Sequence, residues 1–519
     1  MDDDEVLSER VIHQPPSCIA FCPANPSMFV VGTYKLADNE TNSANEGTRS
    51  QSRSQSRSGR VEVYQLRKKA VSPGFGVSQC IDKYDFHDCA VLDLHFHAQD
   101  PTVFAICTST SQMVFFRLKN VERAPVGVSI EPSLLKVGSL AIGEDRTVLA
   151  TSFAWMPQPI MRGPSDMSSA VTFSSGEVKL LQLDLNCDQI LSQARIEPAH
   201  SLEAWTVAFA NLSFPLVDGK SLLTGGDDST LTLHSIKNDD PSGLLQTKQL
   251  FQDRKSHTAG VTAILPVFAA GRLGLNTQAF VTGSYDEHVR VFTHEERPPY
   301  KRKIVAELSL GGGVWRLRKL SEHVIEDSQR GYVRSVLILA SCMHAGVRII
   351  RVIRRQPKQK SEEWCNWEID VVGQFTKGHE SMCYGADSVD VKRLIDRPCY
   401  DDGHRRESVV VSTSFYDKKI CVWSFHDGSP SVDEVNGGSE GCQIVRDESA
   451  QDKTAEQGRE SKHESERRGG TGAEPDIGQE HEPDSVKADS DTSSWTLLPL
   501  SPGSDDEVDK EQCMSWASE

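Results

Sequence analysis

The sequence predicts an all-β fold, a closed β-propeller, and three features carry this prediction. Short alternating apolar runs recur over residues 1–426, and clusters of turn residues separate them. The run 279–293 contains two such strands joined at Gly283-Ser284-Tyr285-Asp286, which is typical of the hairpin in a WD repeat. The glycines at 311–313 then end this unit and lead into the next one. Because a single unit cannot bury its own faces, the pattern has to recur around a ring.

Seven blades fit the recurring units best, and six or eight stay open because blades one to three are weakly patterned. The short segment 6–13 precedes the first complete unit. We expect it to close the ring as the outer strand of blade seven, since closure removes an exposed strand edge. The inner strand and hairpin are assigned, in chain order, to Cys18–Pro23 and Met28–Leu66, Val91–His97 and Val103–Leu118, Phe153–Trp155 and Ala170–Leu183, His200–Trp205 and Leu222–Asp228, His257–Val261 and Ala279–Thr293, Gly313–Trp315 and Leu337–Gly346, and Gly378–Tyr384 and Val409–Trp423.

Two segments lack the periodicity of packed strands. Residues 37–60 interrupt blade one with Ser-Arg and Ser-Gln repeats, a composition that predicts a disordered insert. Residues 427–519 hold 24 acidic and 8 basic residues, a net charge of −16, and predict a disordered acidic tail. The whole chain carries −18, so residues 1–426, the predicted WD40-type propeller domain, are left with −2. A nearly neutral propeller offers no basic field to nucleic acid.

Composition also limits the compartment and the cofactors. The 13 cysteines include no Cys-x-x-Cys pair, the chain starts with acidic residues, and no long apolar run occurs. These features predict a cytoplasmic monomer with reduced thiols and no membrane contact. His95 and His97 share one face of a strand, but no third ligand is spaced to join them. We therefore expect no metal and no other cofactor.

One face of the propeller, which we call the rim, gathers the unusual side chains. The loops that enter each inner strand and the hairpin turns both open onto this face. Rim positions are expected to bury little surface. Asp286 and Asp417 are interpreted as structural residues, each tying its blade to a preceding histidine. The remaining candidates are Trp205, Trp315 and Tyr384 at the starts of inner strands, and Asp227, Asp228, Tyr285, His288, His344 and Tyr416 at the hairpin turns.

Seven segments of blades four to seven resemble, in the same order, those of the diphthine methyl ester hydrolases of the diphthamide pathway. They are His200–Trp205, Gly225–Asp228, Gly283–His288, Gly311–Arg316, Cys342–Gly346, Tyr384–Asp387 and Ser414–Asp417. Generic WD repeats lack the Gly-Gly-Val-Trp-Arg string at 312–316. Gly32-Thr33-Tyr34 in blade one is similar as well, whereas 37–60, 390–408 and the tail are not covered.

This resemblance implies an esterase activity. Members of the family remove the methyl ester of methylated diphthine on translation elongation factor 2, which releases methanol and leaves diphthine for amidation. The ester lies beside a trimethylammonium group, and the faces of Trp and Tyr rings attract such cations. The resemblance thus implies that the substrate is bound by Trp205, Asp227, Asp228, Tyr285, His288, Trp315, Tyr384 and Tyr416.

Ester cleavage also needs an activated water or nucleophile and a donor for the oxyanion. Cys342 and His344 are two residues apart near a strand end and face the same way. This spacing fits a thiol–imidazole pair, and equally a packed cysteine beside a rim histidine. We predict His344 as the base, Cys342 as a candidate nucleophile, and Arg316 or backbone amides as oxyanion donors. The alternative function is a non-catalytic WD scaffold whose aromatic rim binds a peptide or protein partner.

Overall fold

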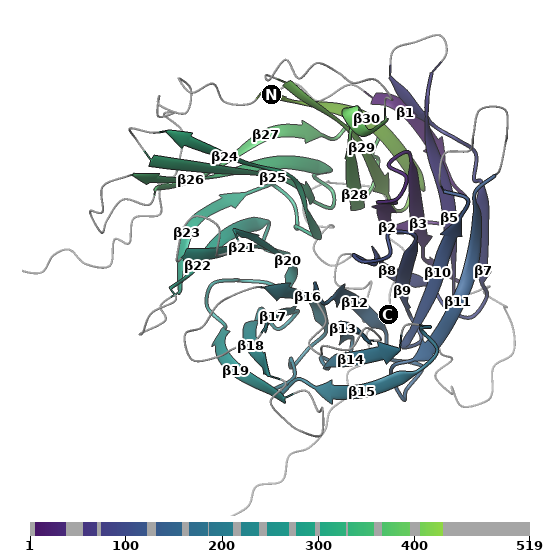
Figure 1. The fold of residues 1–519 in the computed structure, drawn as a ribbon, viewed down its shortest axis with the longest axis horizontal. Coiled ribbons are helices and arrows are strands. Elements are labelled where there is room, and N and C mark those ends of the chain that lie inside the picture. Colours follow the sequence, from purple (N-terminus) through teal and green to yellow (C-terminus); the bar gives the residue numbers. More distant parts are fainter. Residues whose placement is uncertain are drawn as a thin grey trace, which may run out of the picture. The chain divides into compact units, whose positions relative to one another are not determined.

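Seven β-sheets surround a central axis in the computed structural model, as Figure 1 shows, and this confirms the predicted all-β propeller of seven blades. The innermost strands of neighbouring sheets contact one another around the whole ring, and the first and last sheets also meet. The structure describes residues 6–37, 56–69, 74–121, 131–157, 166–184, 186–210, 220–237, 246–268, 277–295, 302–327, 331–357, 366–394 and 405–428.

Blade one is the most irregular sheet, with two short strands in addition to its four main ones. Its strands are β2 (Pro16–Phe21), β3 (Met28–Thr33), β4 (Lys35–Leu36), β5 (Arg57–Lys68), β6 (Phe75–Val77) and β7 (Asp82–Phe86). The short strands β4 and β6 both pair with β5. This irregularity explains why blade one is weakly patterned in the sequence.

The other six sheets have four strands each in the described ranges. From the inner to the outer strand, blade two consists of β8 (Val91–Phe96), β9 (Val103–Thr108), β10 (Gln112–Lys119) and β11 (Ser133–Ala141), and blade three of β12 (Ala150–Trp155), β13 (Asp166–Phe173), β14 (Val178–Asp184) and β15 (Ile190–Arg195). Blade four consists of β16 (Ala204–Ala210), β17 (Lys220–Gly226), β18 (Leu231–Lys237) and β19 (Gln246–Asp253), and blade five of β20 (Val261–Phe268), β21 (Thr277–Ser284), β22 (His288–Glu295) and β23 (Arg302–Ser309).

Blades six and seven complete the ring. Blade six consists of β24 (Arg316–Asp327), β25 (Gly331–Ser341), β26 (Val347–Pro357) and β27 (Asn366–Phe375), and blade seven of β28 (Cys383–Asp390), β29 (Arg405–Ser414), β30 (Lys419–Gly428) and β1 (Val6–Val11). The N-terminal strand β1 pairs antiparallel with β30, from Val11 opposite Lys419 to Val6 opposite Trp423. This confirms the prediction that the segment 6–13 supplies the outer strand of blade seven.

The hydrophobic core lies between neighbouring blades. Because each sheet is covered on both faces, its central strands are buried throughout, as in β3 and β9. Glycines on the second strand of a blade let the next inner strand approach closely. A Cβ atom at Gly32 would lie 2.6 Å from a side-chain atom of Val91, and one at Gly283 would lie 2.5 Å from Val314. These contacts fix the spacing between successive blades.

The boundary of the predicted insert was partly wrong. β5 begins at Arg57, inside the segment 37–60, because Arg57 and Ser58 pair with β4 and extend the hairpin. The residues between, 38–55, lie outside the described ranges.

The predicted domain boundary after residue 426 is also corrected. β30 runs to Gly428, and the buried Asp427 forms an ion pair of 2.9 Å with Arg351. The rest of the predicted tail, 429–519, lies outside the described ranges. One short helix, α1 (Val391–Leu394), follows β28. The described part of the chain holds no helix with the length and apolarity needed to cross a membrane.

Candidate functional site

Asp228, predicted to bind substrate, is a structural residue of blade four. One carboxylate oxygen lies 3.0 Å from His200 Nδ1, and the other accepts the backbone N–H of Ser201 at 2.9 Å. The second ring nitrogen of His200 lies 2.9 Å from Thr224 Oγ1. Burial alone would raise the pKa of Asp228, but the hydrogen bond and charge of His200 outweigh it and lower that pKa. The carboxylate is therefore used inside its own blade, and the prediction for Asp228 was wrong.

The two other turn aspartates are structural residues as predicted, but each binds the residue that follows the preceding histidine and not the histidine itself. Asp286 accepts two hydrogen bonds from Arg290 Nη1, at 2.8 and 2.9 Å, and the backbone N–H of Thr258 at 3.0 Å. Asp417 accepts the backbone N–H of Glu380 at 3.0 Å. Both carboxylates thus hold the loop that enters their blade against its hairpin turn.

Four aromatic residues from blades four to seven meet in one continuous cluster, which we call the aromatic belt. The belt consists of Trp205, Tyr285, Trp315 and Tyr384. The ring centroids of Trp205 and Trp315 are 5.6 Å apart, those of Tyr285 and Trp315 are 6.0 Å apart, and those of Trp315 and Tyr384 are 5.4 Å apart. Trp205 Nε1 donates a hydrogen bond of 3.0 Å to Asp227. The structure therefore brings these four predicted residues and Asp227 together.

The belt is more buried than expected for a rim. Trp205 is 7% exposed and Trp315 is 8% exposed, and Tyr384 is buried as well. Their rings pack edge to face or tilted on one another. The expectation that rim positions bury little surface was wrong for these residues.

Three predicted residues lie on the outer side of the rim. Tyr416 is an exposed residue whose ring packs on Phe415, which in turn contacts Tyr384. His288 is half-buried, with its Nδ1 2.6 Å from the carbonyl oxygen of Asp286. His344 is exposed at the hairpin turn of blade six, and no described residue forms a hydrogen bond or ion pair with it.

Cys342 lies where a nucleophile cannot be reached. Its side chain has 0% exposure and packs in the core between blades five and six, near Val314 and Ala345. Burial raises the pKa of the Cys342 thiol to about 12. Of the two alternatives that the spacing allowed, the structure shows the packed cysteine beside a rim histidine, so Cys342 is removed from the catalytic candidates.

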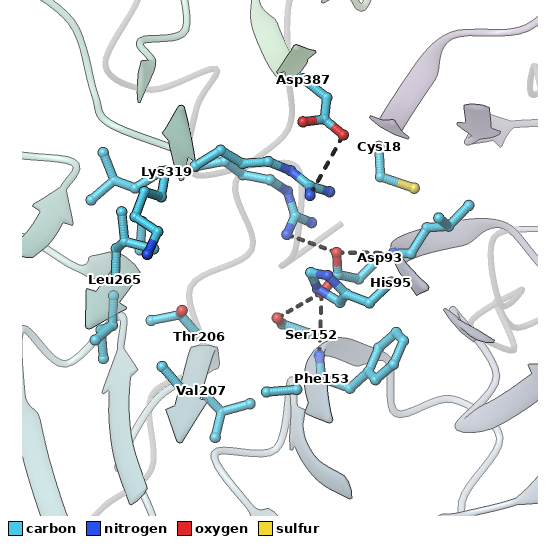
Figure 2. A pocket seen from close by; sticks show the side chains of 18 of the residues that line it. Cys18, Asp93, His95, Ser152, Phe153, Thr206, Val207, Leu265, Lys319 and Asp387 are labelled. Atoms are coloured by element: carbon cyan, nitrogen blue, oxygen red, sulfur yellow. Dashed lines mark hydrogen bonds and ion pairs between the residues drawn. The ribbon is translucent and has the colours of Figure 1, made fainter. Parts of the chain in front are cut away.

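A channel along the propeller axis holds a cavity of about 440 Å³, shown in Figure 2. The inner strands of all seven blades line it. Trp315 contributes to the lining at the belt end, and Lys319 on β24, four residues further along the chain, contributes at the other end. Trp205, Trp315 and Tyr384 of the belt are buried and Tyr285 is half-buried, whereas the side chain of His95 is 35% exposed and that of Lys319 is 45% exposed. The side chains at the belt end of the channel are therefore less exposed than those at the Lys319 end.

Asp93 on β8 is the centre of a polar network in this channel. It is 1% exposed, and Arg316 Nη1 donates to its Oδ1 at 2.7 Å. Its Oδ2 lies 3.0 Å from His95 Nε2 and accepts hydrogen bonds from Ser152 Oγ at 2.8 Å and the N–H of Phe153 at 3.2 Å. Figure 2 shows the side chains of Asp93, His95 and Ser152 pointing toward one another. Burial alone would raise the pKa of Asp93, but Arg316 and His95 outweigh it and hold that pKa well below its usual value.

Two arginines on β24 fill one half of the channel. Arg316 also donates to the carbonyl oxygen of Leu92 at 3.1 Å, and so joins blade six to blade two. Arg318 donates to the carbonyl oxygen of Ile19 at 3.2 Å and pairs with Asp387 at 3.5 Å, which joins it to blades one and seven. Arg316 was predicted as an oxyanion donor on the rim, but its guanidinium is held within the channel by Asp93.

The other half of the channel is left open by small side chains. Blades three, four and five present Ser152, Thr206 and Ala263 at the level of Asp93, since each follows the same register shift at the start of its inner strand. One alternation further on, blades three and four present Ala154 and Ala208, whereas blade five presents the larger Leu265. The cavity is thus lined by the β24 arginines and, at the level of Asp93, by small residues of blades three to five.

The channel network was missed by sequence reasoning, although one signal pointed to it. Asp93 interrupts an otherwise apolar strand, and a charged residue in a buried run has to be paired. His95 was considered only as a metal ligand beside His97. In the structure His97 packs against Trp155 instead, with ring centroids 5.0 Å apart.

Comparison with known proteins finds relatives over most of the chain. No protein-family model matches the sequence. The chain is 24% identical to a protein named diphthine methyltransferase from Schizosaccharomyces pombe, with 76% of this chain and 90% of the relative covered. It is 23% identical to diphthine methyltransferase from Saccharomyces cerevisiae, covering 82% and 99%, and 21% identical to the diphthine methyltransferase homolog of Dictyostelium discoideum, covering 80% and 98%.

Among solved structures, the chain is similar to Sqt1 from Chaetomium thermophilum bound to the N-terminus of the ribosomal protein L10. The two are 13% identical, with 81% of this chain and 90% of that chain covered, at a TM-score of 0.43. A chain of the mitotic checkpoint complex is 12% identical, with 82% and 96% covered, at a TM-score of 0.39.

Proposed function

We propose that this protein hydrolyses the methyl ester of methylated diphthine on translation elongation factor 2. The products are methanol and diphthine, which is then available for amidation to diphthamide. In this proposal the protein acts in the cytoplasm, as a monomer, and needs no cofactor. Support comes from the relatives named for diphthine, which align over 76–82% of this chain, and from the kind of side chain gathered at the channel.

The observation that carries the proposal is the aromatic belt beside Asp227 at one end of the channel. A trimethylammonium group has no N–H to donate, so hydrogen-bond acceptors alone do not select it. Aromatic faces and a nearby carboxylate do, and each good cation–ring contact contributes about 0.5–2 kcal/mol. Trp315 lines the channel and belongs to the belt, which makes it the best placed ring for this contact.

The channel next to the belt also contains the groups that ester cleavage requires. An imidazole activates a water, and a positive charge stabilises the oxyanion. Among the residues predicted from sequence, His344 stays a prediction as the base. Its side chain is exposed at the hairpin turn of blade six and does not line the cavity, so it could act only on a substrate bound at the rim. Arg316 lies in the channel and is held by Asp93.

Methyl transfer is the second candidate, because the relatives are named methyltransferases. The two reactions differ in the fate of the methyl group. Hydrolysis gives methanol and a substrate lighter by one methylene, whereas a transferase adds a methyl group to diphthine. A non-catalytic scaffold would bind the modified factor and change nothing in it.

The test is incubation of the purified protein with methylated elongation factor 2, followed by measurement of methanol and of the mass of the modified peptide. Trp315→Ala should raise KM by about 2- to 30-fold through loss of one cation–ring contact. Trp315→Phe keeps a ring and is the matched control, with melting curves for both because Trp315 is buried. Absence of methanol from the wild-type protein overturns hydrolysis. Methyl transfer is assigned instead if elongation factor 2 carrying unmethylated diphthine gains the mass of one methylene when a methyl donor is supplied.

A further inference from the structure

We propose that His95 is the general base of the channel and that Asp93 is its positioning residue. The substrate class is a carboxylic ester with a neighbouring quaternary ammonium, so this inference rests on the proposed function. The site is distinct from the rim histidine predicted from sequence, because His344 lies at a hairpin turn whereas His95 points into the cavity (Figure 2).

The contacts of Asp93 fix the protonation pattern of His95. Asp93 is buried, and Arg316, Ser152 and the N–H of Phe153 donate hydrogen bonds to its carboxylate, as described above. The N–H of Leu94 donates a further one at 3.0 Å. A carboxylate surrounded by donors only accepts hydrogen bonds, so His95 Nε2 has to carry the proton that lies between them. The lone pair is then on Nδ1, for which no described residue supplies a hydrogen bond.

The ring orientation of His95 is fixed as well. Phe153 packs edge to face on it, with ring centroids 5.0 Å apart and an angle of 77° between the planes. The carboxylate and the phenyl ring therefore leave the imidazole little freedom to rotate. Orientation of a base by a buried carboxylate is the arrangement that enzymes use to keep one nitrogen available.

Ser152 does not serve as the nucleophile. Its hydroxyl donates to Asp93 Oδ2 at 2.8 Å and not to His95, so no base is in position to activate it. Water is left as the attacking group. His95 Nδ1 takes a proton from water while the water oxygen bonds to the ester carbonyl carbon, whose π electrons move onto oxygen. The guanidinium groups on β24 stabilise that oxyanion, and collapse of the intermediate breaks the bond to methoxide, which leaves as methanol with the proton from Nδ1.

The dimensions of the channel fit this assignment. Positions along the channel axis can be counted from Asp93, and Arg316 lies at the same height because the two are paired. Trp315 lies one residue before this height on the chain of blade six. His95 lies two residues beyond it on β8. Three residues at about 3.3 Å each separate the Trp315 level from the His95 level by about 10 Å. That length accommodates an ammonium against Trp315, the adjoining ester, and one water in front of His95. The small residues of blades three to five provide the width.

The exposures on the two sides of the cavity give the direction of approach. The belt side chains at one end are buried or half-buried, and those of His95, Arg318 and Lys319 towards the other end are 34–45% exposed. The modified side chain therefore enters past Lys319 with its ammonium foremost. A long, flexible modified histidine is suited to this approach, since only its tip carries the reacting ester.

The experiment compares His95→Gln with wild type in the methanol assay on methylated elongation factor 2. Loss of the base should lower kcat by about 10²–10⁴-fold, with KM little changed because Gln retains the volume near the substrate. The matched control is His426→Gln, a histidine with a 61% exposed side chain on blade seven, which should behave as wild type. A folded His95→Gln protein with kcat within about tenfold of wild type overturns the assignment.

Asp93→Asn tests the positioning role. It should lower kcat and change the shape of the pH profile of kcat, whereas a smaller folded fraction lowers kcat equally at every pH. If Asp93→Asn fails to fold, the double variant Asp93→Asn/Arg316→Gln removes both charges of the pair and is compared with Arg316→Gln alone, so that the loss of the guanidinium is common to both proteins. Wild-type kcat in the folded variant would overturn the role of Asp93. An inactive wild-type protein would refute the proposed function, whereas an active one with unaffected His95 and Asp93 variants refutes only this inference.

Discussion

At the scale of single residues, the burial of Cys342 leads to a prediction about thiol chemistry. With a pKa of about 12, its thiolate is about one part in 10⁴ of the population at pH 8. Cys342→Ala should keep kcat/KM within about twofold of wild type, because the side chain only packs in the core. Alkylation of the native protein should modify the exposed Cys80 and spare Cys342. Mass spectrometry of the alkylated peptides checks this, and loss of activity on labelling of Cys342 would restore it as a nucleophile.

The aromatic belt was predictable from sequence because Trp205, Trp315 and Tyr384 stand where inner strands begin and Tyr285 stands at a hairpin turn, and both places are readable from the alternation of apolar residues. The network of Asp93 was not predictable in the same way. Its members come from three inner strands and meet only if those strands share a level around the ring. That level is set by register shifts such as the one between Val91 and Asp93. A bulge changes which side chains point inward, and the period-two pattern does not reveal where it lies.

At the scale of elements, the hairpin turns show why some blades were harder to predict than others. In blades two to seven, the turn between the second and third strands contains a residue with positive φ. Glycine adopts this conformation only at Gly176 and Gly346. Elsewhere Ser111, Ser229 or another non-glycine residue adopts the left-handed conformation. The alternating strands and the closure by β1 were predictable, because both depend on local pattern and on the need to cover an edge.

The C-terminal end of β30 gives a prediction that separates two truncations. Truncation after Gly428 should leave the free energy of unfolding unchanged, because the removed segment is acidic and lacks apolar periodicity. Truncation after His426 also removes Asp427, which pairs with Arg351 at 2.9 Å and lies 3.7 Å from His323. The loss should cost about 1.5–3 kcal/mol, as for other hydrogen bonds to charged groups. Urea unfolding of both proteins is the measurement, and equal stability would show that the pair contributes nothing.

At the scale of the whole molecule, three buried histidines make the propeller sensitive to acid. Burial lowers the pKa values of His234, His257 and His379, in blades four, five and seven, to about 4. The unfolded chain takes up these protons near pH 6.5, so it binds more protons than the folded protein between pH 6.5 and 4. Stability should therefore be flat above pH 7, fall as the pH drops through 6.5, and level off near 4.

The expected loss is on the order of 3 kcal/mol for each histidine, since one pKa unit corresponds to about 1.4 kcal/mol. The turn carboxylates of Asp286 and Asp417 stay ionised in the folded protein over this pH range, because their pKa values lie below the ordinary 3.8. Urea unfolding at pH 7.5, 5.5 and 4.5 measures the effect. Equal free energies of unfolding at pH 7.5 and 5.5 would mean that these histidines are not held neutral in the folded ring.

The pair of Arg316 and Asp93 connects sheets that are not neighbours in the ring, and its contribution can be measured by a double-mutant cycle. Arg316→Leu leaves the buried carboxylate of Asp93 without its main counter-charge, and breaking a buried pair in this way costs about 3–5 kcal/mol. Asp93→Asn strands the guanidinium in the same way. The double variant Asp93→Asn/Arg316→Leu leaves no unpaired charge, so it should lose less stability than the sum of the two single variants. Because the pair spans the channel from blade six to blade two, the coupling should appear in the single cooperative unfolding of the ring, followed by urea titration. Strict additivity of the two changes would show that the two groups do not stabilise each other across the channel, and that the neighbouring Ser152 and His95 satisfy Asp93 by themselves.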